Sequence, residues 1–116
     1  MTIREQASEL QRDLALQRAN HVRLTRARVR AELKGETRAA AAAIAADLLT
    51  NPPEWAETWQ IGDLLEALPR VGQVAAASIC NYAHALPTRR LRDLTPRQRQ
   101  VIAERINPTD RTGDRP

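Results

Sequence analysis

Three arginines and a threonine stand close together in a short segment between two expected helices. This segment spans residues 86–94, and its residues of interest are Thr88, Arg89, Arg90 and Arg92. Leu91 and Leu94 can anchor the segment on a core while the arginines project. Guanidinium groups held in a fixed loop suit the clamping of phosphates or entry into the minor groove of a duplex. Asp93 is the only acid there, so the segment predicts contact with DNA or RNA.

A tight turn precedes the next expected helix. Residues 65–72 have the form Leu-x-x-Leu-Pro-x-Val-Gly, in which Pro69 ends one helix. Gly72 is expected either to adopt a positive φ or to let another backbone approach closely. The following helix, in which Ala75, Ala76 and Ala77 would permit close packing, then begins with free N–H groups that suit a phosphate. The expected anion contacts are Arg70, Gly72 and Gln73. A tight helical hairpin without a ligand is the alternative.

A row of basic residues lies along the expected N-terminal helix. At 100° per residue, this row occupies the arc next to Val22, Val29 and Leu33. The row comprises Arg23, Arg26, Arg30 and Lys34. It can face several phosphates along a duplex, or it can be an ordinary solvated face, and the spacing alone allows both interpretations.

The residues that usually carry catalysis or bind metals are isolated. His21 and His84 are far apart with no companion at ligand spacing, so each is expected to be a surface or packing residue. Cys80 is expected to be a buried and inert thiol. A single Cys excludes a disulfide framework and a Cys-based zinc site. We therefore predict that the chain is not an enzyme and needs no metal or cofactor.

The composition predicts a helical fold. The chain has 116 residues, which suits one domain, and 42% of them are hydrophobic and 28% charged, as in a globular protein. Aromatic residues make up only 3%, with no Phe, and the chain is rich in Ala, which favours helix over sheet. Neither a secretion signal nor a membrane span is apparent, so a cytoplasmic location is expected.

The net charge of +4 understates the local positive charge. Residues 18–38 and 70–105 each carry seven bases and two acids, whereas residues 39–69 carry five acids and no base. Two basic blocks therefore flank an acidic block. The basic blocks favour a nucleic-acid partner, and the acidic block leaves open an adaptor that docks on another protein.

Capping signals and apolar spacing define the expected elements. Thr2 with Glu5 and Thr95 with Gln98 form capping boxes, and a break is expected near Gly35. The expected helices span about residues 3–34, 38–49, 61–68, 73–84 and 96–106.

Apolar residues within these helices indicate which faces are buried. One apolar stripe follows the start of the first helix and comprises Ile3, Ala7, Leu10 and Leu14. Trp55 and Trp59 are assigned to the core, and the inward residues of the helix over 73–84 are expected to include Val74, Ala77 and Tyr82. The expected division is a long helical region over 1–50, a binding module over 51–106 and a flexible tail over 107–116.

Several of these motifs resemble the actinobacterial (mycobacterial-type) integration host factor family. The resemblance is carried by the segments 26–34, 64–72, 87–94 and 97–99, in the order found in the family. It implies an all-helical fold in which a long helix precedes a helix–two-turn–helix module. It also implies a nucleoid-associated DNA-binding protein that supports phage integration.

The same resemblance assigns roles to individual residues. Arg89, Arg90 and Arg92 occupy the positions that the family uses on DNA, with Thr88 beside them. In the turn, Arg70 replaces a usual Lys and Gly72 matches the turn glycine, whereas Gln73 and Ala75 stand where the family has Lys, so the turn is expected to bind DNA more weakly.

Together these observations predict a largely sequence-independent binder of double-stranded DNA that compacts or bends it through phosphate contacts and arginines in the minor groove. The chain is expected to be a monomer in the nucleoid, sharing DNA with a phage integrase. An RNA- or ribosome-associated helical module is the alternative.

Overall fold

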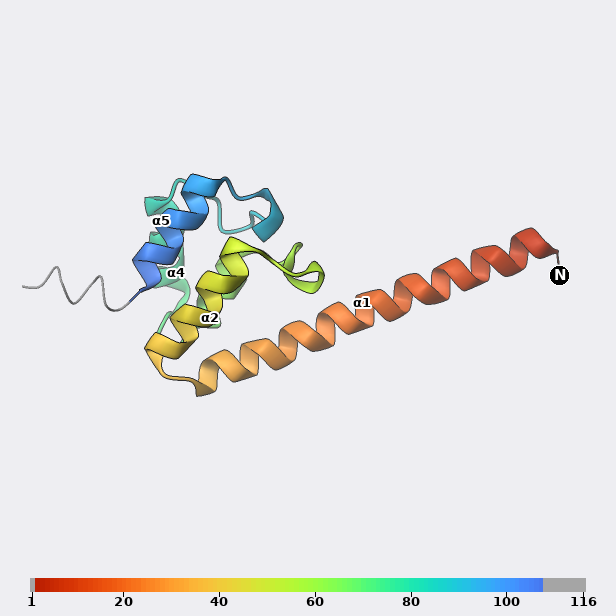
Figure 1. Ribbon diagram of the computed structural model, residues 1–116, viewed down its shortest axis with the longest axis horizontal. Helices are drawn as coiled ribbons and strands as arrows, with labels where there is room; N and C mark the ends of the chain where they lie inside the picture. Colours follow the sequence, from red (N-terminus) through yellow and green to blue (C-terminus); the bar gives the residue numbers. More distant parts are fainter. Residues whose placement is uncertain (1, 108–116) are drawn as a thin grey trace, which may run out of the picture.

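The computed structural model describes residues 2–107, which form a long helical arm attached to a compact helical body (Figure 1). Within these residues there is no strand, only one isolated bridge between Gln60 and Arg90. The elements are α1 (Ile3–Gly35), α2 (Arg38–Thr50), the short 3₁₀ helix η1 (Glu54–Ala56), α3 (Ile61–Glu66), α4 (Gln73–Tyr82), the 3₁₀ helix η2 (Leu91–Asp93) and α5 (Pro96–Ile106). The predicted all-α architecture is confirmed.

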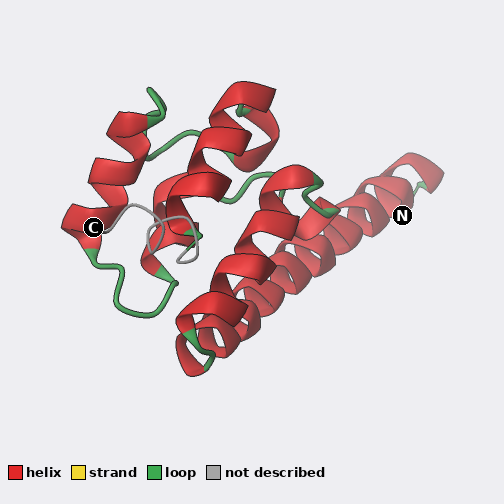
Figure 2. Ribbon diagram, turned by 60° about the vertical axis from the view of Figure 1, so that its left-hand side comes forward, coloured by secondary structure: helices red, strands yellow, loops and turns green. Residues whose placement is uncertain are grey.

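Helix α1 begins and ends where the sequence indicates. The Thr2 hydroxyl accepts the Glu5 N–H, and the Glu5 carboxylate accepts the Thr2 N–H, which completes the predicted capping box. The helix ends at Gly35, and the Thr37 hydroxyl then accepts the Ala40 N–H to start α2. The chain therefore reverses between two caps, and α2 returns along the body (Figure 2).

Only the second half of α1 packs against the body. The side chains over residues 3–21 are all exposed, and burial begins with Val22 and Thr25. Leu33 is fully buried, and Val29 packs against the core. The predicted arc of Val22, Val29 and Leu33 is therefore the face that docks α1, whereas the apolar stripe nearer the N-terminus has no partner within the described chain.

The core lies where α2, α3, α4 and α5 meet. Helix α2 packs on α5, and α4 packs on both α3 and α5. Trp59 is 1% exposed and fills the core next to η1, while Trp55 is half-buried with its ring centroid 6.0 Å from that of Trp59. The assignment of both tryptophans to the core is thus confirmed for Trp59 and in part for Trp55.

Two helices are shorter than the apolar pattern indicates, since α3 ends at Glu66 instead of residue 68 and α4 at Tyr82 instead of residue 84. The end of α4 is closed by His84, whose φ of 58° is left-handed. The His84 N–H donates to the Asn81 carbonyl, and the next N–H, of Ala85, donates to the carbonyl of Cys80. This pairing satisfies the last carbonyls and turns the chain out of the helix.

The buried face of α4 differs from the prediction. Ala76, Cys80 and Ala83 are buried. The residues predicted to point inward, Val74, Ala77 and Tyr82, are exposed instead. Of the three alanines expected to allow close packing, only Ala76 does so. The buried side carries small residues where α4 packs on α3 and α5, whereas the larger apolar side chains of Val74 and Tyr82 lie outside. The size of the apolar side chains therefore points to the wrong face.

The predicted flexible tail over 107–116 lies outside the described residues except for Asn107. No helix within residues 2–107 is long and apolar enough to span a membrane. The division of the chain at residue 50 stays a prediction. Helix α2 nevertheless packs on α5 and shares one core with it.

Candidate nucleic-acid interface

The arginine-bearing loop is fastened by its backbone to the segment that precedes α3. Four backbone hydrogen bonds join residues 87–92 to residues 57–62. They run from the N–H of Ile61 to the carbonyl of Arg89 (2.8 Å), from Gly62 to Pro87 (2.8 Å), from Leu91 to Trp59 (2.9 Å) and from Arg92 to Glu57 (3.0 Å). These bonds surround the isolated antiparallel bridge between Gln60 and Arg90 and fix the geometry of this connection between two helices.

Gly62 allows this close pairing. A Cβ at Gly62 would lie 2.9 Å from the Pro87 Cβ and 3.0 Å from the Pro87 carbonyl oxygen. Only a residue without a side chain permits such an approach. Gly62 could not be singled out from the sequence, because it lies inside an apolar helical pattern with no turn signal around it.

The loop presents its polar side chains outward. Leu91 is fully buried and Leu94 is 4% exposed, which confirms their predicted role as anchors. The side chains between and before them, Thr88, Arg89, Arg90 and Arg92, are exposed. Within residues 2–107 the only ion pair among these is a long one of 3.9 Å between Arg92 Nε and Asp93 Oδ1. The arginines are therefore available to an anionic partner.

Arg99 holds the far end of the loop. Its guanidinium donates to the carbonyl oxygens of Leu94 (3.1 Å), Leu49 (2.6 Å) and Arg92 (3.3 Å). The planar fork of an arginine suits several acceptors at once, and here it joins α5 to the end of α2 and to the loop. In the sequence, Arg99 stands out only as part of the family-like segment 97–99, and nothing there indicates this structural role.

The turn before α4 does not have the expected geometry at Gly72. Gly72 has a φ of −90° and ψ of −174°, and a Cβ there would meet nothing within 4 Å. Both expectations for Gly72, a positive φ and a close backbone contact, are wrong. The left-handed residue is Arg70, with a φ of 64°, two positions earlier. The chain therefore reverses at Arg70, and Gly72 follows in extended conformation.

Gly72 instead leaves the start of α4 uncapped. The first hydrogen bond within the helix runs from the Ala76 N–H to the Gly72 carbonyl, and no side chain caps this end. Arg70, Gly72 and Gln73 are all exposed. The positive end of the α4 dipole thus faces outward beside a basic side chain.

Two of the four bases in the predicted row on α1 bind the body itself. Arg26 donates to the Trp55 carbonyl at 3.0 Å and to the Thr58 hydroxyl. Lys34 donates to the Glu66 carbonyl at 2.7 Å and so closes the end of α3. Burial lowers the pKa of Arg26, the charge of Arg30 lowers it further, and Asp63 opposes both. Arg26 and Lys34 therefore attach α1 to the body.

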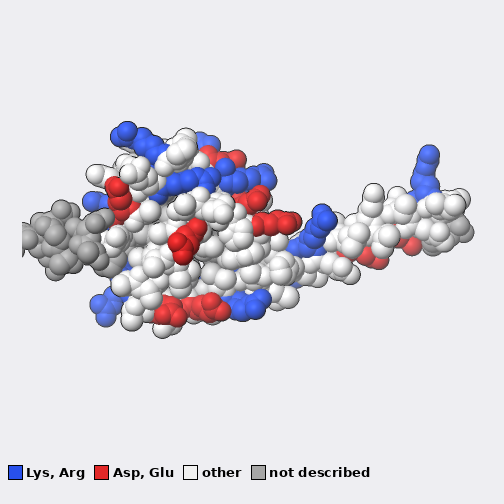
Figure 3. All heavy atoms as spheres, in the orientation of Figure 1, with Lys and Arg blue, Asp and Glu red and all other residues white. Residues whose placement is uncertain are grey.

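The other two bases of the row remain at the surface. Arg23 donates to the Asn20 side chain at 2.6 Å, and the Arg30 guanidinium lies 5.8 Å from the centre of the Trp59 ring. An open groove of about 550 Å³ runs beside them, bordered by Arg18 and Thr58. Basic side chains also gather on the body over α5 and η2 (Figure 3).

The residues considered for catalysis remain apart. His21 and His84 are exposed, as predicted. Cys80 is fully buried, and burial raises the pKa of its thiol, which keeps it protonated and unreactive. No group of three His, Cys, Asp or Glu side chains within residues 2–107 could hold a metal ion.

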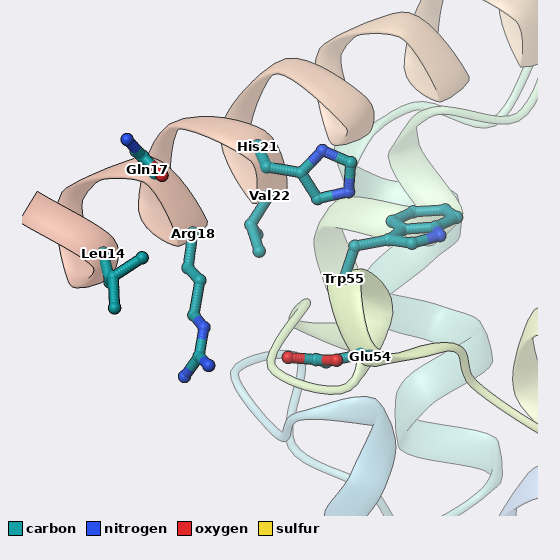
Figure 4. Close-up of a pocket in the computed structure, with 7 residues that line it drawn as sticks. All are labelled: Leu14, Gln17, Arg18, His21, Val22, Glu54 and Trp55. Carbon is teal, nitrogen blue, oxygen red and sulfur yellow. The ribbon is translucent and has the colours of Figure 1, made fainter.

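A second groove, of about 420 Å³, lies between α1 and η1. Leu14, Arg18 and Val22 of α1 face Glu54 and Trp55 across it (Figure 4). Its lining is mostly apolar. It lies where residues 3–21, the free part of α1, meet the body.

Comparison with known proteins places this fold. The integration host factor of Mycolicibacterium smegmatis is 36% identical over 104 residues, which cover 88% of this chain and 94% of that protein. The integration host factor of Mycobacterium tuberculosis is 37% identical over 102 residues, covering 87% of this chain and 93% of that protein. The chain belongs to this integration host factor family.

Two further similarities concern the module. Residues 53–106 match a family model described as an S13-like H2TH domain. A solved structure of sIHF bound to an 8-base-pair palindromic DNA superposes with a TM-score of 0.59 at 25% identity, covering 78% of this chain and 98% of that one. The family resemblance read from the motifs is thus confirmed, as is the helix–two-turn–helix module.

In this integration host factor homologue the H2TH segment contains the Arg89–Arg92 loop and the turn at Arg70. It also contains Gly62, which brings the loop against the start of α3. The two surface bases of α1, Arg23 and Arg30, lie outside the matched segment.

Proposed function

We propose that this protein is a nucleoid-associated architectural protein that binds double-stranded DNA with little dependence on sequence. The observation that carries the proposal is the Arg89–Arg92 loop, in which four backbone hydrogen bonds fix the loop while its arginines stay exposed. A preformed loop loses little conformational entropy on binding, so its charges act fully on the DNA. The DNA-bound homologous fold supports the same conclusion.

Affinity in this proposal comes from phosphates, while the minor groove positions the loop. Arg89, Arg90 and Arg92 would enter or border the groove, with Thr88 donating to the backbone. The uncapped start of α4, together with Arg70 and Gln73, would bind a phosphate. No helix is needed in the major groove, which accounts for binding without strong base preference.

Compaction, bending and support of phage integration follow from this mode of binding. Arginines that insert into a minor groove favour bent DNA, and bending brings distant sites together for a recombinase that shares the same DNA. The protein would act in the nucleoid as a single DNA-binding module per chain, without a cofactor and without catalysis of its own.

Replacement of Arg89, Arg90 and Arg92 by Ala tests the proposal. Charge-assisted hydrogen bonds contribute about 1 kcal/mol or more each, so the triple variant should bind a duplex at least about 100-fold more weakly. Its circular dichroism and melting temperature should stay near wild type, because Leu91 and Leu94, not the arginines, anchor the loop.

A matched control removes the same charge elsewhere. Arg4, Arg12 and Arg28 are exposed on α1 outside the predicted row. Their triple replacement by Ala should weaken binding far less than the loop variant. Equal losses in the two folded variants would mean that net charge alone drives binding, and the proposed site would be wrong.

An RNA partner is the second candidate, because the matched domain is described as S13-like. An A-form duplex presents a wide, shallow minor groove, which differs from the groove of B-form DNA. Competition between duplex DNA and structured RNA in one gel-shift titration distinguishes the two. Stronger competition by the RNA would favour the second candidate.

A further inference from the structure

The free part of α1, residues 3–21, carries an apolar stripe that is exposed along its length, and only its last residue, Leu14, borders the groove beside η1. The exposed fraction is 85% for Ile3, 61% for Leu10 and 46% for Leu14, and Ala7 lies between them, also exposed. A helix without tertiary contacts gains little stability from its own hydrogen bonds in water. Large apolar side chains along such a helix usually mark a surface for a partner.

The spacing of this stripe is that of a coiled coil. Ile3, Ala7, Leu10 and Leu14 follow one another at intervals of four, three and four residues, which average 3.5. Such a seam faces a second helix continuously when the two helices supercoil. In heptad notation these residues alternate between positions d and a over two heptads.

Most of this seam lies on the part of α1 that projects from the body (Figure 1), and only its last residue, Leu14, borders the groove opposite Trp55. At 100° per residue, the stripe occupies the arc next to the face formed by Val22, Thr25, Val29 and Leu33, which docks on the body, and the centres of the two arcs lie about 75° apart. The arm also extends well beyond the body, and the long dimension of the molecule is 73 Å (Figure 1). A second copy of α1 can therefore lie along the stripe while the two bodies project sideways.

Charge favours a second copy in parallel orientation. With Leu14 at position a, Asp13 occupies position g and Arg18 position e of the next heptad. In a parallel pair, the g residue of one helix lies beside the following e residue of the other. Asp13 of each copy therefore faces Arg18 of the other copy, which gives two such pairs in the dimer. In the antiparallel register that matches the apolar residues, Asp13 faces Gln6. Within residues 2–107, neither Asp13 nor Arg18 forms an ion pair.

We propose that two copies of this protein associate through residues 3–18 of α1 as a short parallel coiled coil. Two heptads whose four seam positions hold one Ile, one Ala and two Leu give weak pairing, so the chain is monomeric when dilute and dimeric at high local concentration. The dimer carries two Arg89–Arg92 loops on one stalk. The inference concerns α1 alone and goes beyond the proposed function of the H2TH module.

Sedimentation of the full-length chain without DNA tests the association. The average mass should rise toward that of a dimer between micromolar and millimolar concentration. The double variant Leu10→Glu/Leu14→Glu should weaken association at least about 100-fold, because four apolar side chains leave the interface of each dimer. Leu16→Glu is the matched control, since Leu16 is 64% exposed, like Leu10, but lies about 150° from the stripe.

A charge exchange tests the orientation. Asp13→Arg should weaken association by placing two like charges side by side, and the double variant Asp13→Arg/Arg18→Asp should restore it. In addition, Ile3→Cys should form a disulfide between copies under mild oxidation, because residue 3 meets itself only in a parallel pair. Cys80 is buried and would not interfere.

The outcomes separate this inference from the proposed function. The Leu10→Glu/Leu14→Glu variant should bind a duplex that is too short for two modules as wild type does. A wild-type chain that remains monomeric up to millimolar concentration would overturn the inference and leave the stripe to another protein or a lipid surface. Equal association of the stripe variant and wild type would overturn it as well.

Discussion

Two glycines near the proposed interface differ in what they require of the structure. The Gly62 N–H donates to the Pro87 carbonyl, and no space is left there for a Cβ. Gly72 instead has an ordinary extended backbone with open space around it. Gly62→Ala should therefore destabilise the fold by about 1–3 kcal/mol, as overpacking does, and should displace the arginine loop. Thermal unfolding and duplex affinity should fall together.

Gly72→Ser is the contrasting variant. Ser favours the start of a helix, and the backbone of Gly72 already has the extended conformation of such a residue. This variant should match or exceed the wild-type melting temperature. If Gly62→Ala melted like wild type, the contact with Pro87 would not hold the loop. If Gly72→Ser unfolded the protein, the turn would depend on Gly72 after all.

The turn before α4 also shows what could be read from single residues. Pro69 and Gly72 correctly indicate that a turn separates two helices. They do not indicate which residue adopts the left-handed conformation, and that residue is Arg70, a type for which this conformation is uncommon. Glycine is the usual choice there, so sequence reasoning placed the strained position two residues too late.

At the scale of helices, the docking of α1 depends on two basic residues that were predicted to face a ligand. Arg26 and Lys34 donate to backbone carbonyls of the body. Replacement of both by Ala should lower the free energy of unfolding by about 2 kcal/mol, because charged donors leave carbonyl acceptors without partners. Chemical denaturation measures the change.

The pair Arg23→Ala/Arg28→Ala serves as the control for this prediction. It removes the same charge from α1 but no hydrogen bond to the body. Its stability should lie within about 0.5 kcal/mol of wild type, as for most surface substitutions. If both double variants were destabilised equally, the charge of α1, and not its attachment to the body, would account for the lost stability.

Helix boundaries were predictable where a local signal fixes them. The predicted capping residues Thr2 and Thr95 each begin a helix in the structure, and the predicted break lies at Gly35. The buried side of α4 was not predictable, since the larger apolar residues Val74 and Tyr82 lie on its exposed side and the choice depends on packing against α3 and α5. The role of Arg26 was likewise not apparent, because its acceptors lie 29 and 32 residues away in sequence.

At the scale of the whole molecule, the two basic blocks of the sequence contribute differently. The block over 70–105 carries exposed arginines on a fixed loop. In the block over 18–38, Arg26 and Lys34 attach α1 to the body, whereas Arg23 and Arg30 stay at the surface beside the groove on α1. The salt dependence of DNA binding distinguishes these contributions, because each phosphate contact adds a fixed amount to the slope.

The double variant Arg23→Gln/Arg30→Gln therefore tests whether α1 takes part in DNA binding. If both side chains face phosphates, the slope of log affinity against log salt should flatten by up to about 1.8, or about 0.9 per contact, equally for unrelated duplexes. The loop variant at Arg89, Arg90 and Arg92 should flatten it by up to about 2.7 by the same rule. Affinity measured at several salt concentrations gives both values. An unchanged slope for the α1 variant, with the loop variant flattened, would confine the DNA-binding surface to the H2TH module and leave the free part of α1 to association between copies.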